Sequence, residues 1–196
     1  MMGKKYISKS ANRFALIGFL AVFVNTQAVS GEMPKNPSIQ SGNVTIEGKG
    51  TNHLKIQQKT NKSIINWDSF SVHKGGRVDF NMPSSRSSSL NRVTGSTPST
   101  IAGQINSNGK VLLINPNGVA ITKNGVVKTG SFAASTLDIK NNDFLKDIYS
   151  FKRKNNSKGV ENSGKIIVGN GGNASLLGGY VSNSGTIMAC LLYTSP

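Results

Sequence analysis

The sequence of 196 residues contains little of the chemistry that disulfide-bonded proteins, metalloproteins and enzymes need. It has one cysteine (Cys190), two histidines and eight carboxylates. A single cysteine excludes an intramolecular disulfide framework. His53 and His73 stand alone, with no second histidine or cysteine at the spacing of metal ligands. The sequence therefore predicts no metal and no cofactor.

The carboxylates are too few and too scattered to indicate catalysis. A secreted, polysaccharide-active β-helix enzyme is one alternative function, and it needs two carboxylates that converge in a groove. Asp68 and Asp79 flank one strand-like segment and would approach each other if the chain were coiled, but turn capping explains them equally well. No catalytic residue is assigned, and a protein that is not an enzyme is expected.

Acidic residues are also scarce relative to basic ones, which leaves a formal charge of +15. Four of the positive charges open the chain, at Lys4, Lys5, Lys9 and Arg13. They precede an apolar run at 14–24 that is too short to span a bilayer, and small residues then lead to Ala28. This order predicts a secretory signal peptide over residues 1–28, read by the Sec machinery and cleaved after Ala28.

The other lysines are spread along the chain, with one cluster, KRKNNSK, at 152–158. An excess of positive charge suits nucleic acid, anionic glycans or a bacterial surface. No aromatic residue interleaves with this cluster as a stacking platform for bases requires, so no specific nucleic-acid partner is predicted. A solvated basic loop is favoured. A basic glycan-binding module is the alternative, and it predicts steeply salt-dependent binding at Lys152–Lys158.

Turn residues and short β-branched runs are what the chain has in quantity. It holds 22 glycines, and VLLINPNGVAITKNGVV (111–127) shows how they are used. Pro116 lacks an N–H and suits the second position of a tight turn, over which Asn115 can close an Asx-turn. Asn117 and Gly118 tolerate the left-handed conformation. The four residues are therefore predicted to form a corner between two strands.

A weak repeat indicates how such strands are arranged. Four segments begin and end with an apolar residue and carry glycine at the fifth position: 105–111, 121–127, 160–166 and 181–187. A unit of about 20 residues with like corners predicts a solenoid, an all-β parallel β-helix with an inward core of Val, Ile and Leu. A β-sandwich is the competing architecture, although its hairpins would not require like corners to recur.

The solenoid is expected to occupy residues 29–189 in seven or eight coils. Residues 29–60 show few repeat features and are predicted to form an N-terminal cap, because the end coil would otherwise present unpaired strand edges. The lysine-rich segment 140–158 is an enlarged loop, in which 143–151 forms a short helix or a hairpin. Residues 190–196 break every upstream pattern and are interpreted as a truncated or chimeric tail.

Two longer blocks, 65–95 and 108–139, resemble the secretion domain of two-partner-secretion exoproteins, the filamentous haemagglutinins and high-molecular-weight adhesins. Their order and spacing are kept over about 75 residues, which is more specific than any one tetrapeptide. The residues expected to serve transporter recognition or structure are Asn66, Trp67, Asn91, Arg92, Asn115, Pro116, Asn117 and Gly118. The family commonly has Phe-Gly shortly after the corner, where this chain has Lys123-Asn124.

The resemblance implies a right-handed β-helix with small extra-helical hairpins or loops, at the N-terminus of a large exported protein. It implies recognition in the periplasm by the POTRA domains of an outer-membrane β-barrel transporter, and folding at the surface of a Gram-negative bacterium. It also implies an adhesin or haemagglutinin that contacts a host-cell surface or glycans, as a monomer. For the corner 115–118, and likewise for Asn91 and Arg92, structural stabilisation is favoured over transporter contact, because buried Asn corners satisfy backbone groups that strands leave unpaired.

Overall fold

A computed structural model describes residues 32–153 and 158–189 of the chain. The predicted signal peptide (1–28) and tail (190–196) lie outside the described residues, so both stay predictions. Within the described part, no helix has both the length and the apolar character needed to cross a membrane.

The described residues form short strands, as the β-branched runs and the many turn residues predicted, with one helical turn. In chain order the elements are β1 (Ser38–Ser41), β2 (Val44–Glu47), β3 (His53–Gln58), β4 (Lys62–Trp67), β5 (Arg77–Asn81), β6 (Ser88–Val93), β7 (Ser99–Ile101), β8 (Gln104–Ser107), β9 (Lys110–Ile114), β10 (Val119–Ile121), β11 (Val126–Thr129), β12 (Ser131–Ser135), β13 (Asp138–Ile139), α1 (Asn141–Leu145), β14 (Phe151–Lys152), β15 (Val160–Asn162), β16 (Lys165–Val168), β17 (Ala174–Leu177), β18 (Val181–Asn183) and β19 (Thr186–Ala189).

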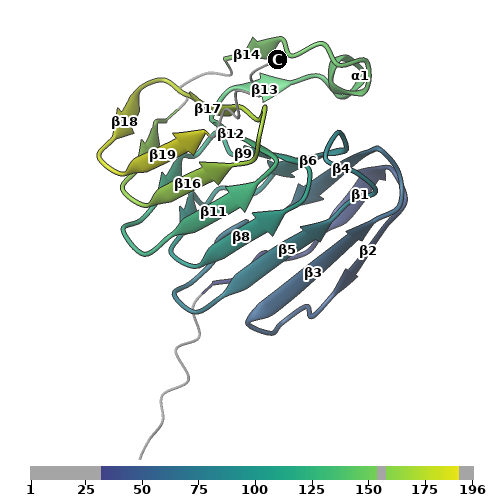
Figure 1. The fold of residues 1–196 in the computed structure, drawn as a ribbon, viewed down its shortest axis with the longest axis horizontal. Helices are drawn as coiled ribbons and strands as arrows, with labels where there is room; N and C mark the ends of the chain where they lie inside the picture. The colour runs from purple at the N-terminus through teal and green to yellow at the C-terminus, as the bar shows by residue number, and fades with distance from the viewer. Residues whose placement is uncertain (1–31, 154–157, 190–196) are drawn as a thin grey trace, which may run out of the picture.

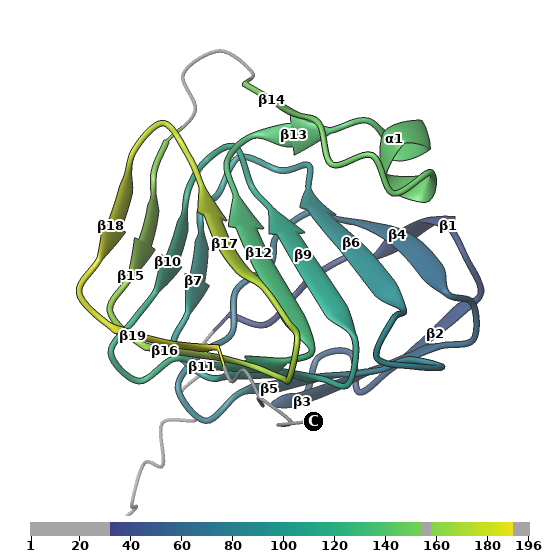
Figure 2. The same ribbon diagram turned by 45° about the horizontal axis from the view of Figure 1, so that its top comes forward.

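The strands build three walls around one core (Figures 1 and 2). The first wall has the order β1-β4-β6-β9-β12-β17, the second β7-β10-β15-β18, and the third β2-β3-β5-β8-β11-β16-β19. The chain passes from the third wall to the first, then to the second, and back to the third one rung higher. Successive rungs pair in parallel throughout. The predicted parallel β-helix is therefore confirmed, and the facing antiparallel sheets of a β-sandwich are not formed by these residues.

The N-terminal end is closed by two antiparallel strands. β1 pairs with β4 and β2 pairs with β3, so the first rung does not present free strand edges on these walls. The predicted cap is confirmed, but it is shorter than 29–60, since β3 already belongs to the parallel stack.

The number of coils is smaller than predicted. The third wall contains six parallel strands among the described residues (β3, β5, β8, β11, β16 and β19), which gives about six turns instead of seven or eight. The difference arises because the residues between β12 and β15 leave the solenoid without adding a rung.

The interior is filled by the inward side chains of the three walls. Fully buried members include Ile65, Val78, Phe80, Ile105, Val127 and Ile166. Trp67 and Phe70 meet edge to face, with ring centroids 5.3 Å apart and an interplanar angle of 86°. Burying each large apolar side chain contributes about 1.5–3 kcal/mol, so this continuous core is the main stabilising element.

Stacked glycines explain three of the four sequence repeats. Gly125, Gly164 and Gly185 precede paired positions of the third wall, at the corner that leads from the second wall. A Cβ on Gly164 would lie 2.4 Å from the Gly125 carbonyl oxygen, and one on Gly185 would lie 2.2 Å from the Gly164 carbonyl oxygen. The backbones approach too closely for any side chain. The segment 105–111 was wrongly grouped with these repeats, since Gly109 lies at the corner from the third wall to the first.

Most of the enlarged loop predicted at 140–158 lies among the described residues, where it forms an insert on the first wall. We call residues 138–152 the insert: β13 and β14 pair antiparallel, and α1 lies between them, so the segment is both a hairpin and a short helix. The insert covers the outer face of the first wall (Figure 2). A second apolar cluster forms there, made of Ile64, Leu90, Leu112, Ile114, Ile139 and Phe144.

Candidate recognition site

All eight predicted motif residues lie on the first wall or at its end. Asn66 and Trp67 end β4, Asn91 and Arg92 lie in β6, and the corner 115–118 directly follows β9. In the register of β4 and β6, Asn66 is opposite Arg92 and Ile65 is opposite Asn91. Because side chains alternate along a strand, Asn66 and Arg92 face outward while Trp67 and Asn91 face the core.

Trp67 and Asn91 form a polar pair inside the apolar core. Both side chains are fully buried, and the Trp67 indole N–H donates a 3.0 Å hydrogen bond to Asn91 Oδ1. The Asn91 amide nitrogen lies 3.2 Å from Ser89 Oγ and 3.5 Å from the Leu112 carbonyl oxygen. Burying a polar group without a partner is costly, so each of these two residues needs the other.

A second buried polar ladder was missed by the sequence reasoning. The Ser63 hydroxyl lies 2.6 Å from Gln58 Oε1 and 3.0 Å from Ser89 Oγ, and all three residues are buried. The Gln58 amide also donates to the Ser88 carbonyl oxygen on the next rung. Ser63 and Ser89 occupy paired positions of β4 and β6. An alignment of the strand sequences with one another would have shown that Ser63 and Ser89 occupy equivalent positions.

Arg92 holds the insert against the first wall. Its Nε donates to Asp138 Oδ1 at 2.8 Å, one terminal nitrogen donates to Asn141 Oδ1 at 2.9 Å, and the other donates to the Ile139 carbonyl oxygen at 2.7 Å. The side chains of the Arg92–Asp138 pair are only 14% and 15% exposed. Such charge-assisted hydrogen bonds are among the stronger ones in proteins, so this contact fixes the start of the insert.

Lys62 holds the middle of the insert, where α1 ends. Its ammonium group donates to the Leu145 carbonyl oxygen and pairs with Asp147, at 2.8 and 2.7 Å. The hydrogen bond from Lys62 lowers the pKa of Asp147 below its ordinary value and outweighs the small effect of burial. The insert is therefore tied to β4 by Lys62 and to β6 by Arg92, with Phe144 packed between them.

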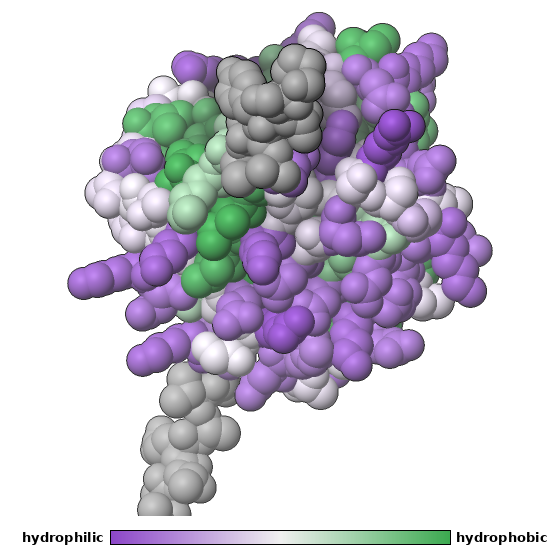
Figure 3. Space-filling view, viewed as in Figure 1, coloured by the Kyte–Doolittle hydropathy of each residue, from purple (hydrophilic) through white to green (hydrophobic). Residues whose placement is uncertain are grey.

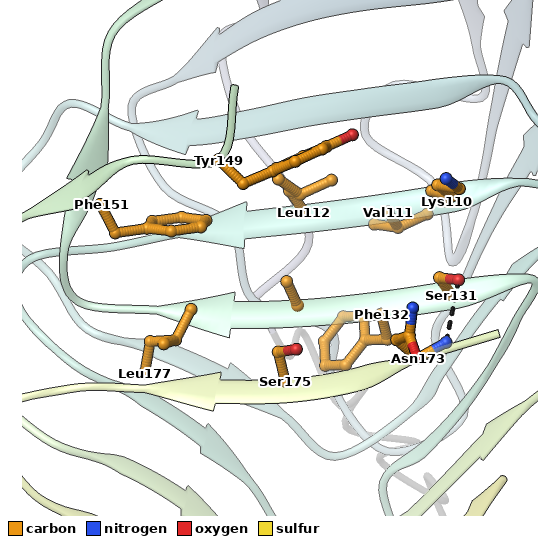
Figure 4. A pocket seen from close by; sticks show the side chains of 11 residues that line it. Lys110, Val111, Leu112, Ser131, Phe132, Tyr149, Phe151, Asn173, Ser175 and Leu177 are labelled. Carbon is orange, nitrogen blue, oxygen red and sulfur yellow. Dashed lines mark hydrogen bonds between the residues drawn. The ribbon is translucent and has the colours of Figure 1, made fainter. Parts of the chain in front are cut away.

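The insert stops short of the C-terminal rungs. At its edge an apolar pocket of about 190 Å³ opens between Phe151 of the insert and Leu177 of β17 (Figure 4). Tyr149 borders the pocket, and burial raises the pKa of its hydroxyl. Across the floor, the Asn173 backbone N–H donates to Ser131 Oγ at 3.1 Å. The insert thus covers the outer face of β4, β6 and β9 and ends over β12.

Asn66 shares the outward face of Arg92 but has a different environment. It pairs in register with Ser38 of the cap strand β1. Its Oδ1 atom is buried and has no hydrogen-bond donor among the described groups. Asn66 therefore borders the N-terminal cap strand β1.

The corner after β9 is held together by its own asparagines. Asn115 is fully buried, and its Oδ1 accepts from the Asn117 N–H at 3.0 Å, so the predicted Asx-turn over Pro116 is confirmed. Gly118 donates its N–H to the Asn115 carbonyl oxygen and adopts φ +118°. Of the two residues that tolerate a left-handed conformation, Asn117 and Gly118, only Gly118 takes a positive φ at this corner.

The same corner is bonded to the rungs below and above it. The Asn115 amide donates to the Thr97 carbonyl oxygen and to Ser99 Oγ, each at 2.9 Å, and Asn117 donates to the Gly95 carbonyl oxygen at 2.8 Å. The Pro116 carbonyl oxygen accepts from the Lys158 N–H at 3.3 Å. A turn of this kind fixes the bend and also the vertical stacking of three rungs.

The acidic residues and histidines do not form a reaction centre in the described ranges. Asp68 accepts from Asn36 at 2.7 Å, whereas Asp79 is bonded to Arg77, His53 and Asn106, so the two carboxylates share no partner. His73 bonds Asn52 and its neighbour's carbonyl oxygen. Residues 32–153 and 158–189 contain no group of three or more side chains able to hold a metal ion.

The fold and the site together define a parallel β-helical domain in which a set of polar motif residues holds one wall, one corner and one insert in place. Comparison with known proteins agrees with this class. The family model described as the TPS secretion domain matches residues 28–189. The chain therefore belongs to this family, the secretion domains of two-partner-secretion exoproteins.

Individual relatives lead to the same family. The crystal structure of the HMW1 secretion domain from Haemophilus influenzae is similar with a TM-score of 0.71 and 34% identity, over 79% of this chain and 41% of that one. Two heme/hemopexin-binding proteins of Haemophilus influenzae are 36% and 32% identical over 115 and 137 residues. Those matches cover 59% and 70% of this chain, but only 13% and 15% of the relatives.

Family membership establishes where the domain acts. It is the secretion domain of an exoprotein that passes through the periplasm to the cell surface of a Gram-negative bacterium, with an outer-membrane transporter as its partner. These three relatives are a secretion domain and two heme/hemopexin-binding proteins.

Proposed function

We propose that this domain directs the export of a longer surface protein by engaging the POTRA domains of its transporter before it has folded. The signal peptide at 1–28 takes the chain through the inner membrane by the Sec machinery, and the transporter passes it outward in extended form. The rungs then assemble outside, one on another. Each added rung opposes return through the pore, because repeat folds propagate by nearest-neighbour contacts.

The eight motif residues act, in this proposal, by stabilising the folded form. One observation carries it: Asn91 and Asn115 are 0% exposed, and their side chains are bonded within the fold. Arg92 is engaged with the insert in the same way. A folded domain does not present these groups to a partner, so their contribution comes when the rungs pack.

Contact with the transporter is then made through the backbone of extended segments. The N-terminal segments β1 and β2 pair at the edges of the walls only after folding. Before folding, segments of this kind have free backbone donors and acceptors that can add a strand to a POTRA sheet. In this scheme the domain remains a monomer and requires no cofactor.

Export from cells that carry the cognate transporter tests this function. Deletion of residues 65–139 removes both motif blocks and is expected to abolish export, whereas unchanged export would refute the proposal. Point variants separate the steps further. Asn115→Ala is expected to reduce the amount of folded protein outside, because the corner loses its Asx-turn, and the matched control Asn173→Ala removes an exposed side chain with no hydrogen bond among those described.

The exported protein as a whole is proposed to be an adhesin or haemagglutinin that binds a host-cell surface. The support is the family and the two relatives whose names state binding to heme and hemopexin. The chain spans only about a seventh of their length. In this proposal the binding region belongs to the part that the relatives have beyond it. Adherence of cells expressing the whole gene, with and without the region that follows this domain, measures that contribution.

A further inference from the structure

The outer face of the third wall carries a shallow polar groove, made of two depressions that meet at one residue. Two depressions of about 380 and 370 Å³ lie along β5 and β8 and share Arg77 between them. Figure 3 shows this face, which is hydrophilic over β3, β5 and β8. From Gln104 to Asn108 the groove follows β8 for about 13 Å, which is the length of a short extended chain.

The groove exists because its floor is narrow and partly bare. At the corner before β8, a Cβ on Gly103 would lie 2.3 Å from the Gly76 carbonyl oxygen, so no side chain fills this end. Along β8 the outward residues are amides, Gln104 and Asn106. Asn106 is drawn toward Asp79, to which it donates at 2.9 Å, and this leaves the space beside it open.

Three amides in the groove are free to bind a ligand. The side chains of Asn81, Gln104 and Asn124 are exposed, and none has a hydrogen-bond partner among the described residues. Each amide offers donors and an acceptor, which is the combination that pairs with hydroxyl groups. Such a lining favours a ligand rich in hydroxyl groups.

The charges in the groove favour an anion. Its one carboxylate, Asp79, is already bonded to Arg77 and His53 at 2.8 and 2.7 Å as well as to Asn106. Lys74 lines one depression and Lys128 the other, and neither has a carboxylate within 4.0 Å in the described part of the chain. Each depression thus combines one unpaired cation with at least one free amide.

We propose that this groove binds a linear anionic oligosaccharide, one whose carboxylate or sulfate groups meet Lys74 and Lys128 and whose hydroxyl groups meet the free amides. A single-stranded nucleic acid fits less well. Its bases need exposed aromatic rings to stack on, and the one ring that borders the groove, Phe80, is 1% exposed. The site is distinct from the basic cluster at 152–158 and does not depend on the export role.

Titration of the purified protein with a size-fractionated heparin octasaccharide tests the proposal. The double variant Lys74→Glu/Lys128→Glu is expected to raise Kd by about tenfold or more, because two charge-assisted contacts are lost. The control Lys49→Glu/Lys146→Glu makes the same change of charge at exposed lysines away from the groove, and it is expected to stay within about twofold of the parent protein. If both double variants weakened octasaccharide binding equally, the proposed site would be refuted.

A neutral substitution distinguishes a built site from general attraction of polyanions. Gln104→Ala keeps the charge of the groove and is expected to weaken octasaccharide binding by about three- to fivefold through the lost amide contacts. Equal affinity of the parent protein for single-stranded DNA of matched charge, or no effect of Gln104→Ala, would contradict the proposal. Unchanged thermal unfolding of each variant shows that the measured loss concerns binding and not folding.

Discussion

The first and third walls of the β-helix use polar side chains in opposite ways. On the first wall, Trp67 and Asn91 pair inside the core and Arg92 fixes the insert outside, so the polar groups are enclosed on both faces. On the third wall, Arg77 and Asp79 lie on an open outer face. Enclosed polar groups stabilise one arrangement of the chain, whereas exposed ones remain available to a ligand.

The largest difference is expected between two asparagines. Asn91→Ala leaves the buried Trp67 N–H without a partner and creates a small cavity, so it should lower the free energy of unfolding by about 2–3 kcal/mol. Asn106→Ala removes one hydrogen bond to Asp79 on the open wall and should lower it by less than about 1 kcal/mol. Urea unfolding followed by tryptophan fluorescence measures both, and equal losses would break the distinction between the walls.

The next difference concerns two arginines. Arg92→Ala removes three hydrogen bonds to the insert at a side chain that is 14% exposed. It should lower the free energy of local opening of the insert by about 2 kcal/mol. Arg77→Ala removes an ion pair whose arginine side chain is 51% exposed. It should change the free energy of unfolding only slightly, because exposed ion pairs contribute little to stability. Hydrogen exchange of α1 amides detects the first effect. Unchanged protection of α1 in Arg92→Ala would show that the apolar cluster alone holds the insert.

The smallest expected effect is a weaker attachment of the insert to the first wall at acidic pH. The pKa of Asp147 is lowered by its hydrogen bond to Lys62, so the folded pKa lies below the unfolded one. The contribution of Asp147 is therefore present above the unfolded pKa of about 4 and is lost as the pH falls through the folded pKa. Protection of α1, corrected for intrinsic exchange, should decrease as the pH falls below the unfolded pKa of about 4, and Asp147→Asn should remove that decrease.

Asp79 provides a second test of pH dependence, on the third wall. Burial alone would raise its pKa, but the hydrogen bonds from Arg77, Asn106 and His53 outweigh burial and lower it. Its stabilising contribution is likewise lost only in acid, below about pH 4. Because Asp79 is remote from the insert, Asp79→Asn should change the acid limb of global unfolding without altering the exchange of α1. A change in α1 would mean that the two walls are coupled.

The sequence predicted those features that depend on local chemistry or on a short period. A repeat of about 20 residues with Asn/Gly corners predicted the solenoid. The ability of Asn115 to close an Asx-turn predicted the turn over Pro116. The glycine repeat correctly predicted that Gly125, Gly164 and Gly185 stack at one corner of the coil. It failed for Gly109, since the three corners of one rung use the same residue types and differ only in their place in the coil.

Features that depend on distant parts of the chain were not predictable. Arg92 and Asp138 are 46 residues apart, and Lys62 and Leu145 are 83 apart, so neither contact leaves a pattern in any one segment. The predicted number of coils was too high for the same reason, because the residues of the insert do not form a rung. The groove was missed because Gln104 becomes a neighbour of Arg77, and Lys128 a neighbour of Asn106, only when the rungs are stacked in register.

The central claim is that the enclosed motif residues serve folding and not transporter contact. The most direct test measures, for Asn91→Ala and Asn115→Ala, both the Kd of the unfolded chain for the transporter's periplasmic domains and the urea midpoint of the folded domain. The account predicts a Kd within about twofold of the parent protein and a clearly lower midpoint. A Kd raised by about tenfold with an unchanged midpoint would contradict it.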